Sequence, residues 1–299
     1  MTMNTLDRHP RYAWAGPPRR REPATALRLM AVLAHPDDES LACGGTLARY
    51  AAEGVDVHVV MATRGQAGRH GPGEHPGTEA VGRLRESEFR AAARELDVRG
   101  VHVLGYHDGR LDQADPVEAA GRIARILRRV RPHVVLTFGA DGLYGHPDHI
   151  AVSQLTSAAL AEAGAPEGTN AAHIVSKLYH IAWDAETWEI YQDTFKRLVS
   201  RVDGVERCAT PWPAWAITTR VDARAWWRRV WRAVGHHRTQ MAVYGPLGHL
   251  PPERHERLWG HQTYYRVFSR VNGGRAVETD LFEGLRAVTA AERPAKMAS

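Results

Sequence analysis

The strongest constraint on the fold is a regular alternation of apolar runs with amphipathic segments. Four short apolar runs have the length of buried strands: 27–34, 55–62, 101–104 and 133–138. Segments with helical periodicity follow each of them: 41–53, 80–96, 116–131 and 147–163. Strands that alternate with helices of this length form parallel sheets whose two faces are covered. The sequence therefore predicts an α/β domain with a mostly parallel sheet flanked by helices.

The pattern becomes less regular after residue 173. We expect four more elements there: strands over 174–182 and 214–221, a helix over 223–243 and a strand over 264–271. No linker rich in Pro, Gly or Ser separates this region from what precedes it. We therefore predict a single domain over 26–286, whose later part is an α+β extension of the same core. The Pro- and Arg-rich start, 1–25, and the end, 287–299, are predicted to be disordered tails.

Composition argues against several classes of protein. The 299 residues carry a net charge of +5, with 36 Arg and three Lys. Because these cations are scattered among acidic residues, we predict no nucleic-acid partner. No apolar run approaches the roughly 18 residues of a membrane-spanning helix, and the N-terminus lacks the apolar core of a secretory signal. Two cysteines are too few for a disulfide framework, so a cytoplasmic location is expected.

Two polar clusters follow predicted strands. HPDDE, residues 35–39, comes directly after the first strand, and DGLYGHPDH, residues 141–149, comes after the strand that ends at Phe138. In open α/β sheets, ligands bind beyond the carboxyl ends of the strands. We therefore expect both clusters to lie at one edge of the sheet and to form a single site.

The residue types in these clusters are those of a metal hydrolase. Catalytic zinc is held by three His or carboxylate ligands and keeps one position open for water. His35 and Asp38 from one cluster, with a His from the other, would supply such a set, and Asp37 would remain as a base. An acidic helix start could explain Asp37 to Glu39 alone. A helix start does not explain why a similar cluster, HPDH, follows another predicted strand.

On these residues the chain resembles the LmbE-like, or PIG-L, family of zinc-dependent de-N-acetylases. The family motif A-H-P-D-D-E stands at 34–39, and H-P-D-H stands at 146–149. The segment around Arg85 and Glu88 looks like the family's R-x-x-E helix, and 237–240, HRTQ, is similar to its late H-x-[ST]-Q element. The resemblance extends over most of 27–270.

The resemblance implies a Rossmann-like sheet and one Zn²⁺ per chain with three ligands: His35, Asp38 and His149. It implies Asp37 as the general base. It also implies His146, oriented by Asp148, as the imidazole that stabilises the tetrahedral intermediate or acts as an acid. Tyr144 matches a tyrosine that polarises the substrate carbonyl in some members.

The contacts with substrate are less defined. Arg85 and Asp108 are expected either to bind sugar hydroxyls at the rim or to form a structural ion pair. Gln66 is expected to bind substrate; it stands where many family members carry Glu, so it keeps hydrogen bonding but loses charge, and any contact that needs a carboxylate there is in doubt. His237 is expected to reach the pocket. The Gly-rich loop 64–79 is expected to be either a substrate lid or an ordinary surface loop.

Three local features have structural interpretations. The Arg- and Trp-rich segment resembles a nucleic-acid surface, but its apolar residues fall on one helical stripe typical of core packing: Trp227, Val230, Trp231 and Val234. His70 and His75 are expected to be solvated loop residues rather than metal ligands. Glu39 is expected to be a carboxylate that either supports the site from behind or starts a helix, and Gly44 and Gly45 are expected to allow close packing behind the site.

The function expected from these features is the removal of an acetyl group from an N-acetylglucosamine-type amino sugar in a small-molecule glycoconjugate. One alternative is a zinc amidase that cleaves a larger amide, such as a thiol conjugate. Another is a non-catalytic sugar- or nucleotide-binding module; nucleotide binding is disfavoured because no G-x-G-x-x-G follows the first strand. The sequence leaves open whether the chain forms a homo-oligomer.

Overall fold

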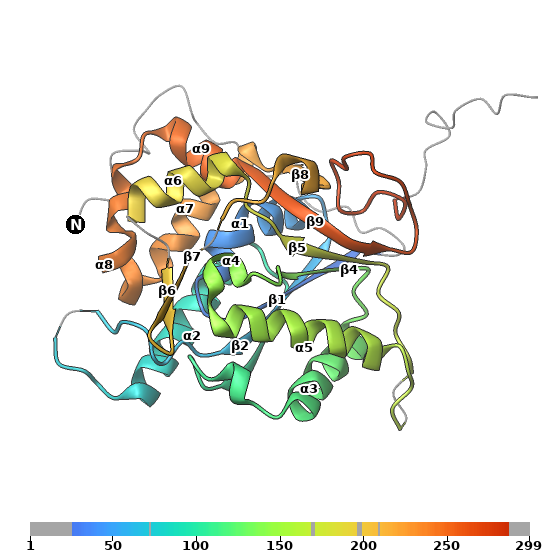
Figure 1. The fold of residues 1–299 in the computed structure, drawn as a ribbon, viewed down its shortest axis with the longest axis horizontal. Coiled ribbons are helices and arrows are strands. Elements are labelled where there is room, and N and C mark those ends of the chain that lie inside the picture. The colour runs from blue at the N-terminus through green and yellow to red at the C-terminus, as the bar shows by residue number, and fades with distance from the viewer. Residues whose placement is uncertain (1–25, 72, 169–170, 196–198, 209, 287–299) are drawn as a thin grey trace, which may run out of the picture.

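The computed structural model describes residues 26–71, 73–168, 171–195, 199–208 and 210–286 (Figure 1). The predicted tails, 1–25 and 287–299, lie outside the described residues. None of the helices in the described ranges combines the length and apolarity needed to cross a membrane.

A seven-stranded sheet forms the centre of the molecule, in the order β3-β2-β1-β4-β5-β9-β8. The first five strands in the chain are parallel: β1 (Arg28–Leu33), β2 (Asp56–Thr63), β3 (Gly100–Tyr106), β4 (Val134–Phe138) and β5 (Lys177–Ile181). The inner strands are buried from both sides, as in β4, where every residue is buried, whereas the edge strand β3 is mostly half-buried. The predicted α/β class with a mostly parallel sheet is confirmed.

Helices cover both faces of this sheet (Figure 1). The helices of the parallel part are α1 (Asp38–Ala52), α2 (Thr78–Glu95), α3 (Pro116–Val130), α4 (Gly142–Gly145) and α5 (Pro147–Ala163). Helix α3 packs against α5, whereas α1 and α2 pack against helices from the C-terminal part. The bounds of α5 agree with the prediction because Pro147 fixes its first turn.

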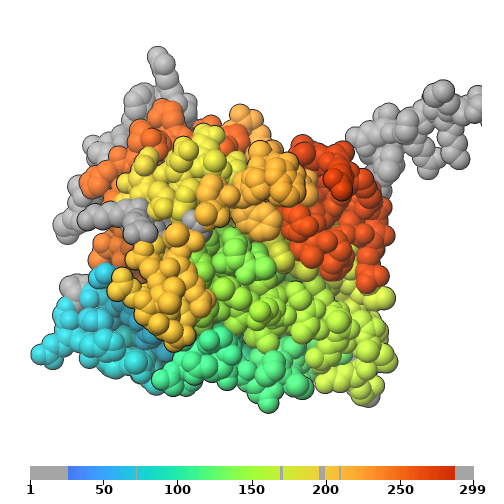
Figure 2. All heavy atoms as spheres, viewed as in Figure 1, coloured from blue at the N-terminus to red at the C-terminus, as the bar shows by residue number. Residues whose placement is uncertain are grey.

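The C-terminal part completes the sheet with antiparallel strands. Strand β9 (His261–Ser269) pairs with β5 and with β8 (Thr219–Asp222). Three elements there were not predicted: helix α6 (Ala185–Phe195), the hairpin of β6 (Val199–Val202) with β7 (Val205–Cys208), and helix α9 (Pro252–Gly260). Figure 2 shows the hairpin, in gold, exposed on the viewed face of the molecule.

The predicted continuous helix over 223–243 is wrong. It is divided into a 3-10 turn over Arg224–Trp226, α7 (Trp227–His236), a second turn over Arg238–Gln240 and α8 (Met241–Tyr244). The helix ends at His237, whose backbone leaves the helical region with φ −80° and ψ 60°. The predicted core stripe on α7 is confirmed: Trp227, Val230 and Val234 are buried, and Trp231 packs against the core.

The order of the strands positions the site. Strands β1 and β4 are neighbours, and the chain leaves them in opposite directions along the sheet, toward β2 and toward β5. Ligands bind at such switch points in doubly wound sheets. Close packing supports α1 at this point, because a Cβ on Gly45 would lie 2.2 Å from the carbonyl oxygen of Trp259. Residues 35–39 and 141–149 follow these two strands, so the predicted convergence of the two clusters is confirmed.

Candidate metal centre and active site

Two imidazoles face each other at the end of β1. His35 Nε2 donates to Asp148 Oδ2 at 3.1 Å and lies 3.1 Å from Asp108 Oδ1. His149 Nδ1 donates to the carbonyl oxygen of Gly142 at 3.2 Å. The ring protons are therefore used on the far sides of the rings. His35 Nδ1 and His149 Nε2 face each other 3.2 Å apart, so a proton or a metal ion is needed to hold these two nitrogens together.

The carboxylate of Asp38 completes a triangle with these nitrogens. Its Oδ1 lies 3.5 Å from His149 Nε2, and its Oδ2 lies 3.7 Å from His35 Nδ1. Backbone amides of Ala34 and His35 hold Oδ2 in place. Tetrahedral zinc with bonds of about 2.0–2.2 Å would separate its ligands by about 3.3–3.6 Å. The spacing and donor types of these three residues therefore fit a divalent metal ion.

The electrostatics of the triangle also favour a cation. Burial lowers the pKa of His35, but hydrogen bonds to Asp108 and Asp148 outweigh it and raise that pKa to about 10. Burial raises the pKa of Asp38 to about 7, although the charge of His35 opposes this. The protein thus stabilises one positive charge at this point, which a proton or a metal ion can supply. Two other groups of side chains could also hold a metal: His35 with His146 and His149, and His35 with Asp108 and Asp148.

Asp37 is held rigidly beside the triangle. It lies in the left-handed region with φ 115°, which is strained for a residue other than glycine. Its Oδ2 accepts hydrogen bonds from Arg85 Nη2 at 2.9 Å and from the Tyr244 hydroxyl at 2.6 Å. Both bonds end on Oδ2, which leaves Oδ1 for the cavity. Burial raises the pKa of Asp37 even though Arg85 lowers it, which suits a carboxylate that accepts a proton.

Glu39 supports Asp37 from behind, as predicted. Its Oε2 accepts from the backbone amide of Asp37 at 2.9 Å, and its Oε1 lies 2.8 Å from His237 Nε2. His237 is only 1% exposed and does not line the cavity. The structure therefore contradicts the prediction that His237 reaches the substrate: its ring is turned toward Glu39, and it acts on the site through that carboxylate.

His146 and Tyr144 lie on the β4 side of the triangle. His146 is the N-cap of α5, and its Nδ1 accepts from the backbone amide of Asp148 at 3.2 Å. Its remaining nitrogen, Nε2, therefore carries the proton of the neutral ring. Burial, followed by the nearby charge of His35, lowers the pKa of His146 to about 4. The Tyr144 ring packs edge-on against His149 with ring centroids 5.3 Å apart.

The prediction that Asp148 orients His146 is wrong. The Asp148 carboxylate accepts from His35 and from the backbone amides of Gly109 and Leu111, at 2.7 and 3.0 Å. Its side chain projects back toward β1 because it stands at the start of α5, two residues after the cap. Asp148 therefore fixes the ring of His35 instead.

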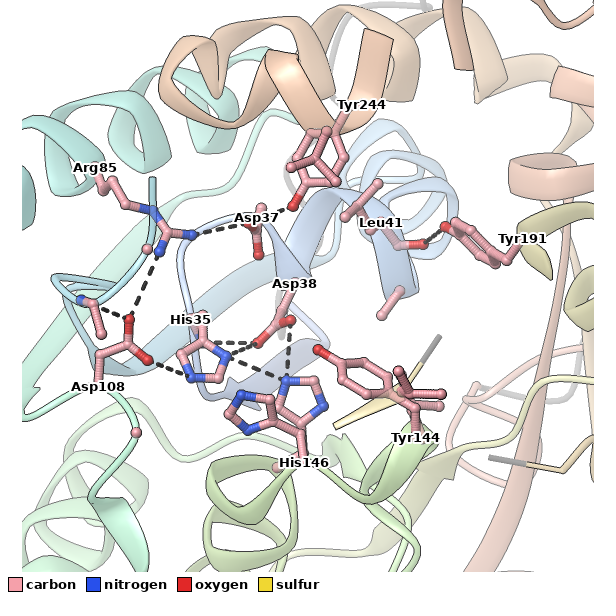
Figure 3. Close-up of a pocket in the computed structure, with 18 of the residues that line it drawn as sticks. His35, Asp37, Asp38, Leu41, Arg85, Asp108, Tyr144, His146, Tyr191 and Tyr244 are labelled. Carbon is pink, nitrogen blue, oxygen red and sulfur yellow. Dashed lines mark hydrogen bonds and ion pairs between the residues drawn. The ribbon is translucent and has the colours of Figure 1, made fainter. Parts of the chain in front are cut away.

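A cavity of about 530 Å³ opens over these groups (Figure 3). Arg85 and Asp108 line it, and they also belong to the buried network through Asp37 and His35. Gln66 does not line it: its side chain donates to the carbonyl oxygen of Tyr106 and accepts from the amide of Arg64. This placement contradicts the prediction that Gln66 binds substrate, because both polar atoms of its side chain bond to the protein backbone. Gln66 shapes the loop instead.

The loop 64–79 borders the cavity through Ala67 and Gly68. His70 and His75 stack edge to face with each other, at 4.8 Å between ring centroids. Within the described ranges, they belong to none of the clusters that could hold a metal. Whether the loop closes over the substrate stays a prediction.

Several cavity residues were missed by sequence reasoning. They come from the part of the chain after β5, where no motif marks them: Trp183, Tyr191, Val199, Val243 and Tyr244. Tyr244 follows the HRTQ element by four residues, and that proximity was the one available signal. The others are ordinary apolar residues, and only the folded chain brings them to the site.

Comparison with known proteins supports a family assignment. The sequence profile described as "PIG-L: GlcNAc-PI de-N-acetylase" matches residues 30–160. The 1D-myo-inositol 2-acetamido-2-deoxy-alpha-D-glucopyranoside deacetylase of Thermobifida fusca is 34% identical to this chain over 245 residues. This match covers 73% of this chain and 85% of that protein.

Solved structures share the fold at lower identity. The N,N'-diacetylchitobiose deacetylase of Pyrococcus horikoshii is 19% identical with a TM-score of 0.59, over 81% of this chain and 84% of that one. The 4-carboxy-2-hydroxymuconate hydratase of Pseudomonas putida is 21% identical with a TM-score of 0.61, over 84% of this chain and all of that one. Because their names give different reactions, the fold alone does not decide the chemistry.

Proposed function

The chain belongs to the PIG-L family of GlcNAc-PI de-N-acetylases, and on this premise we propose that it removes the acetyl group from an N-acetylglucosamine-type sugar in a small-molecule glycoconjugate. The observation that carries the proposal is the pair of facing ring nitrogens on His35 and His149, 3.2 Å apart beside two aspartates. The relative named as a sugar deacetylase supports an amino-sugar substrate.

We propose zinc as the metal, with one ion per chain held by His35, Asp38 and His149. The ring nitrogen of each imidazole that faces away from the metal position bonds to an oxygen acceptor, the arrangement that orients histidine ligands in metal sites. When bound, the ion supplies a Lewis acid that activates water and polarises the amide carbonyl. The remaining steps belong to side chains of the protein.

Asp37 is the proposed general base. Its Oδ1 takes a proton from the attacking water, and the same carboxyl returns that proton to the amine as the C–N bond breaks. His146 donates its Nε2 proton as a hydrogen bond to the carbonyl oxygen, where negative charge develops, and the Tyr144 hydroxyl assists. The low pKa of His146 favours this role of a neutral donor over that of an acid.

Arg85 and Asp108 are proposed to meet the sugar at the rim of the cavity. Both side chains already form hydrogen bonds with other groups of the protein, which hold them in fixed positions for contact with the substrate. We also propose that the protein works in the cytoplasm, where Cys43 and Cys208, both free, would stay reduced.

Acetate release from a panel of N-acetylglucosaminides and thiol conjugates, with metal analysis, tests the proposal. His35→Ala and His149→Ala should lose the metal, whereas His75→Ala, in the exposed loop, should keep it. Asp37→Asn should keep the metal and lose turnover by about 100-fold or more. Full activity in metal-free protein would overturn the metal centre. Cleavage confined to thiol conjugates would support the amidase, and sugar binding without acetate release would support a binding module.

A further inference from the structure

The hairpin of β6 and β7 lies against the α4 turn (Gly142–Gly145), which carries Tyr144. Both strands of the hairpin contact this turn (Figure 1). A Cβ placed on Gly145 would lie 2.7 Å from the Cβ of Arg207, so the second strand packs directly on the turn. Val199, in the first strand, lines the cavity. The hairpin therefore links the cavity wall to the turn that holds Tyr144.

The backbone of the α4 turn is strained. Gly142, Leu143 and Gly145 have positive φ values of 60°, 63° and 74°. The conformation of Leu143, with ψ −61°, is unfavourable for a residue that has a side chain. Strained backbone persists only where surrounding contacts fix it. We therefore expect contacts from outside the turn to hold it in shape.

Ser200, in β6, supplies such a contact. Its hydroxyl oxygen lies 2.8 Å from the carbonyl oxygen of Gly145 and 3.2 Å from that of Tyr144, so its one proton is donated to the nearer oxygen or shared between the two. Ser200 is only 9% exposed, so water has little access to replace this hydrogen bond. The bond fixes the backbone from which the Tyr144 side chain projects.

The position of the Tyr144 hydroxyl depends on that backbone. The hydroxyl points toward the candidate metal ligands (Figure 3) and forms no hydrogen bond with another of the described residues. The ring itself packs edge-on against His146, with ring centroids 5.8 Å apart, as well as against His149. The backbone of the turn and the packing of the ring therefore place the hydroxyl.

We propose that Ser200 is a positioning residue, which holds the α4 turn so that the Tyr144 hydroxyl meets the carbonyl oxygen of the substrate as negative charge develops there. This inference rests on the proposed deacetylase function, in which Tyr144 assists at that oxygen. Without the Ser200 bond the turn can relax, and the hydroxyl is less often in place when the amide reacts. The loss belongs to kcat rather than to KM, because the interaction strengthens in the transition state.

Two single variants and their combination test the inference by acetate release. Tyr144→Phe should lower kcat by about tenfold or more, and Ser200→Ala should lower it by about fivefold. Because Ser200 acts through the Tyr144 hydroxyl, adding Ser200→Ala to Tyr144→Phe should change kcat by less than about twofold. A further loss of about fivefold in the double variant overturns the inference, and so does full kcat in either single variant.

Two control variants separate positioning from general stability. Ser200→Thr keeps the hydroxyl and should retain kcat within about twofold. Arg201→Ala changes the next residue of β6, whose side chain is 72% exposed and pairs with Glu206, and it should also leave kcat within about twofold. If Arg201→Ala lowers kcat as much as Ser200→Ala does, the effect comes from the hairpin as a whole and the assignment to Ser200 is wrong.

A second readout does not depend on turnover. In protein labelled with 3-fluorotyrosine, the fluorine resonance of Tyr144 is assigned by its absence from Tyr144→Phe. Ser200→Ala should shift or broaden this resonance, whereas Arg201→Ala should not. An unchanged resonance in Ser200→Ala overturns the positioning role. Failure of the unmodified protein to release acetate from any N-acetylglucosaminide contradicts the deacetylase function instead, and the fluorine spectra still decide whether Ser200 positions Tyr144.

Discussion

Tyr244 provides the sharpest test of how Asp37 is held. Its hydroxyl donates to Asp37 Oδ2 at 2.6 Å, and Asp37 is only 8% exposed. Tyr244→Phe removes this hydrogen bond and keeps the ring. A hydrogen bond to a charged group contributes about 1.5–3 kcal/mol, which corresponds to roughly 10- to 150-fold in rate if all of it positions the base. Arg85 still holds the same oxygen, so we expect the lower end, about tenfold.

The loss should appear in kcat, because Tyr244 acts through Asp37 rather than on the sugar. Steady-state acetate release measures kcat and KM, and metal analysis shows whether the site stays loaded. Tyr264→Phe is the matched control. Its hydroxyl also makes a buried bond of 2.6 Å, to Thr46 Oγ1, but it lies outside the cavity. It should lower the melting temperature and leave kcat within about twofold.

The opposite results would refute the reasoning. If Tyr244→Phe retains full kcat with normal metal content, Arg85 and the backbone hold Asp37 without it. If both tyrosine variants lose turnover equally, the effect is a general loss of packing. If Tyr244→Phe changes KM alone, Tyr244 contacts the substrate directly.

Three further predictions concern the metal, a buried ion pair and a close contact. Chelation should abolish acetate release, and added Zn²⁺ should restore it; activity that survives complete metal removal contradicts the proposal. Burial raises the pKa of Glu278, but hydrogen bonds from Lys177 and Asn272 lower it to about 2, so its stabilisation is present above the ordinary pKa of 4.5 and is lost as the pH falls from there toward 2. In urea titrations at pH 7, Glu278→Gln should lower the free energy of unfolding by about 3–5 kcal/mol, because it removes the carboxylate that pairs with the buried Lys177. Glu167→Gln, in a pair whose carboxylate is half-exposed, should lower it by at most about 1 kcal/mol. Gly45→Ala should lower the melting temperature strongly, and Gly245→Ala, with open space around it, should not; equal effects would show that the contact with Trp259 relaxes.

Local pattern predicted the parallel half of the fold because each of its strands and helices is a continuous periodic segment. Strand β4 and helix α5 were located almost to the residue. The hairpin β6–β7 was missed because its strands have four residues each, and those of β7 are exposed, so no apolar alternation marks it. The helix predicted over 223–243 failed because its break lies at His237, where a tertiary bond to Glu39 overrides local preference.

The candidate site also has a part that was predicted from the sequence and a part that was not. The convergence of His35, Asp38 and His149 was predicted because they lie in two short motifs that follow neighbouring strands. The contact between Asp148 and His35 was not predicted. The direction in which a side chain points at the start of a helix decides which ring its carboxylate contacts, and the sequence does not show that direction. The contact of Tyr244 with Asp37 joins residues 207 positions apart, and no local signal connects them.

The position of these residues in the chain determines which of their proposed roles can be inferred from the family motifs. The family profile matches residues 30–160, which contain the proposed metal ligands and Asp37. Tyr244 and the cavity residues from Trp183 onward lie outside that range. The proposed metal ligands and this part of the cavity wall therefore come from different parts of the chain. The motifs alone describe the amide chemistry, so substrate assays with variants of the C-terminal part test the contribution of the cavity wall independently of the metal centre.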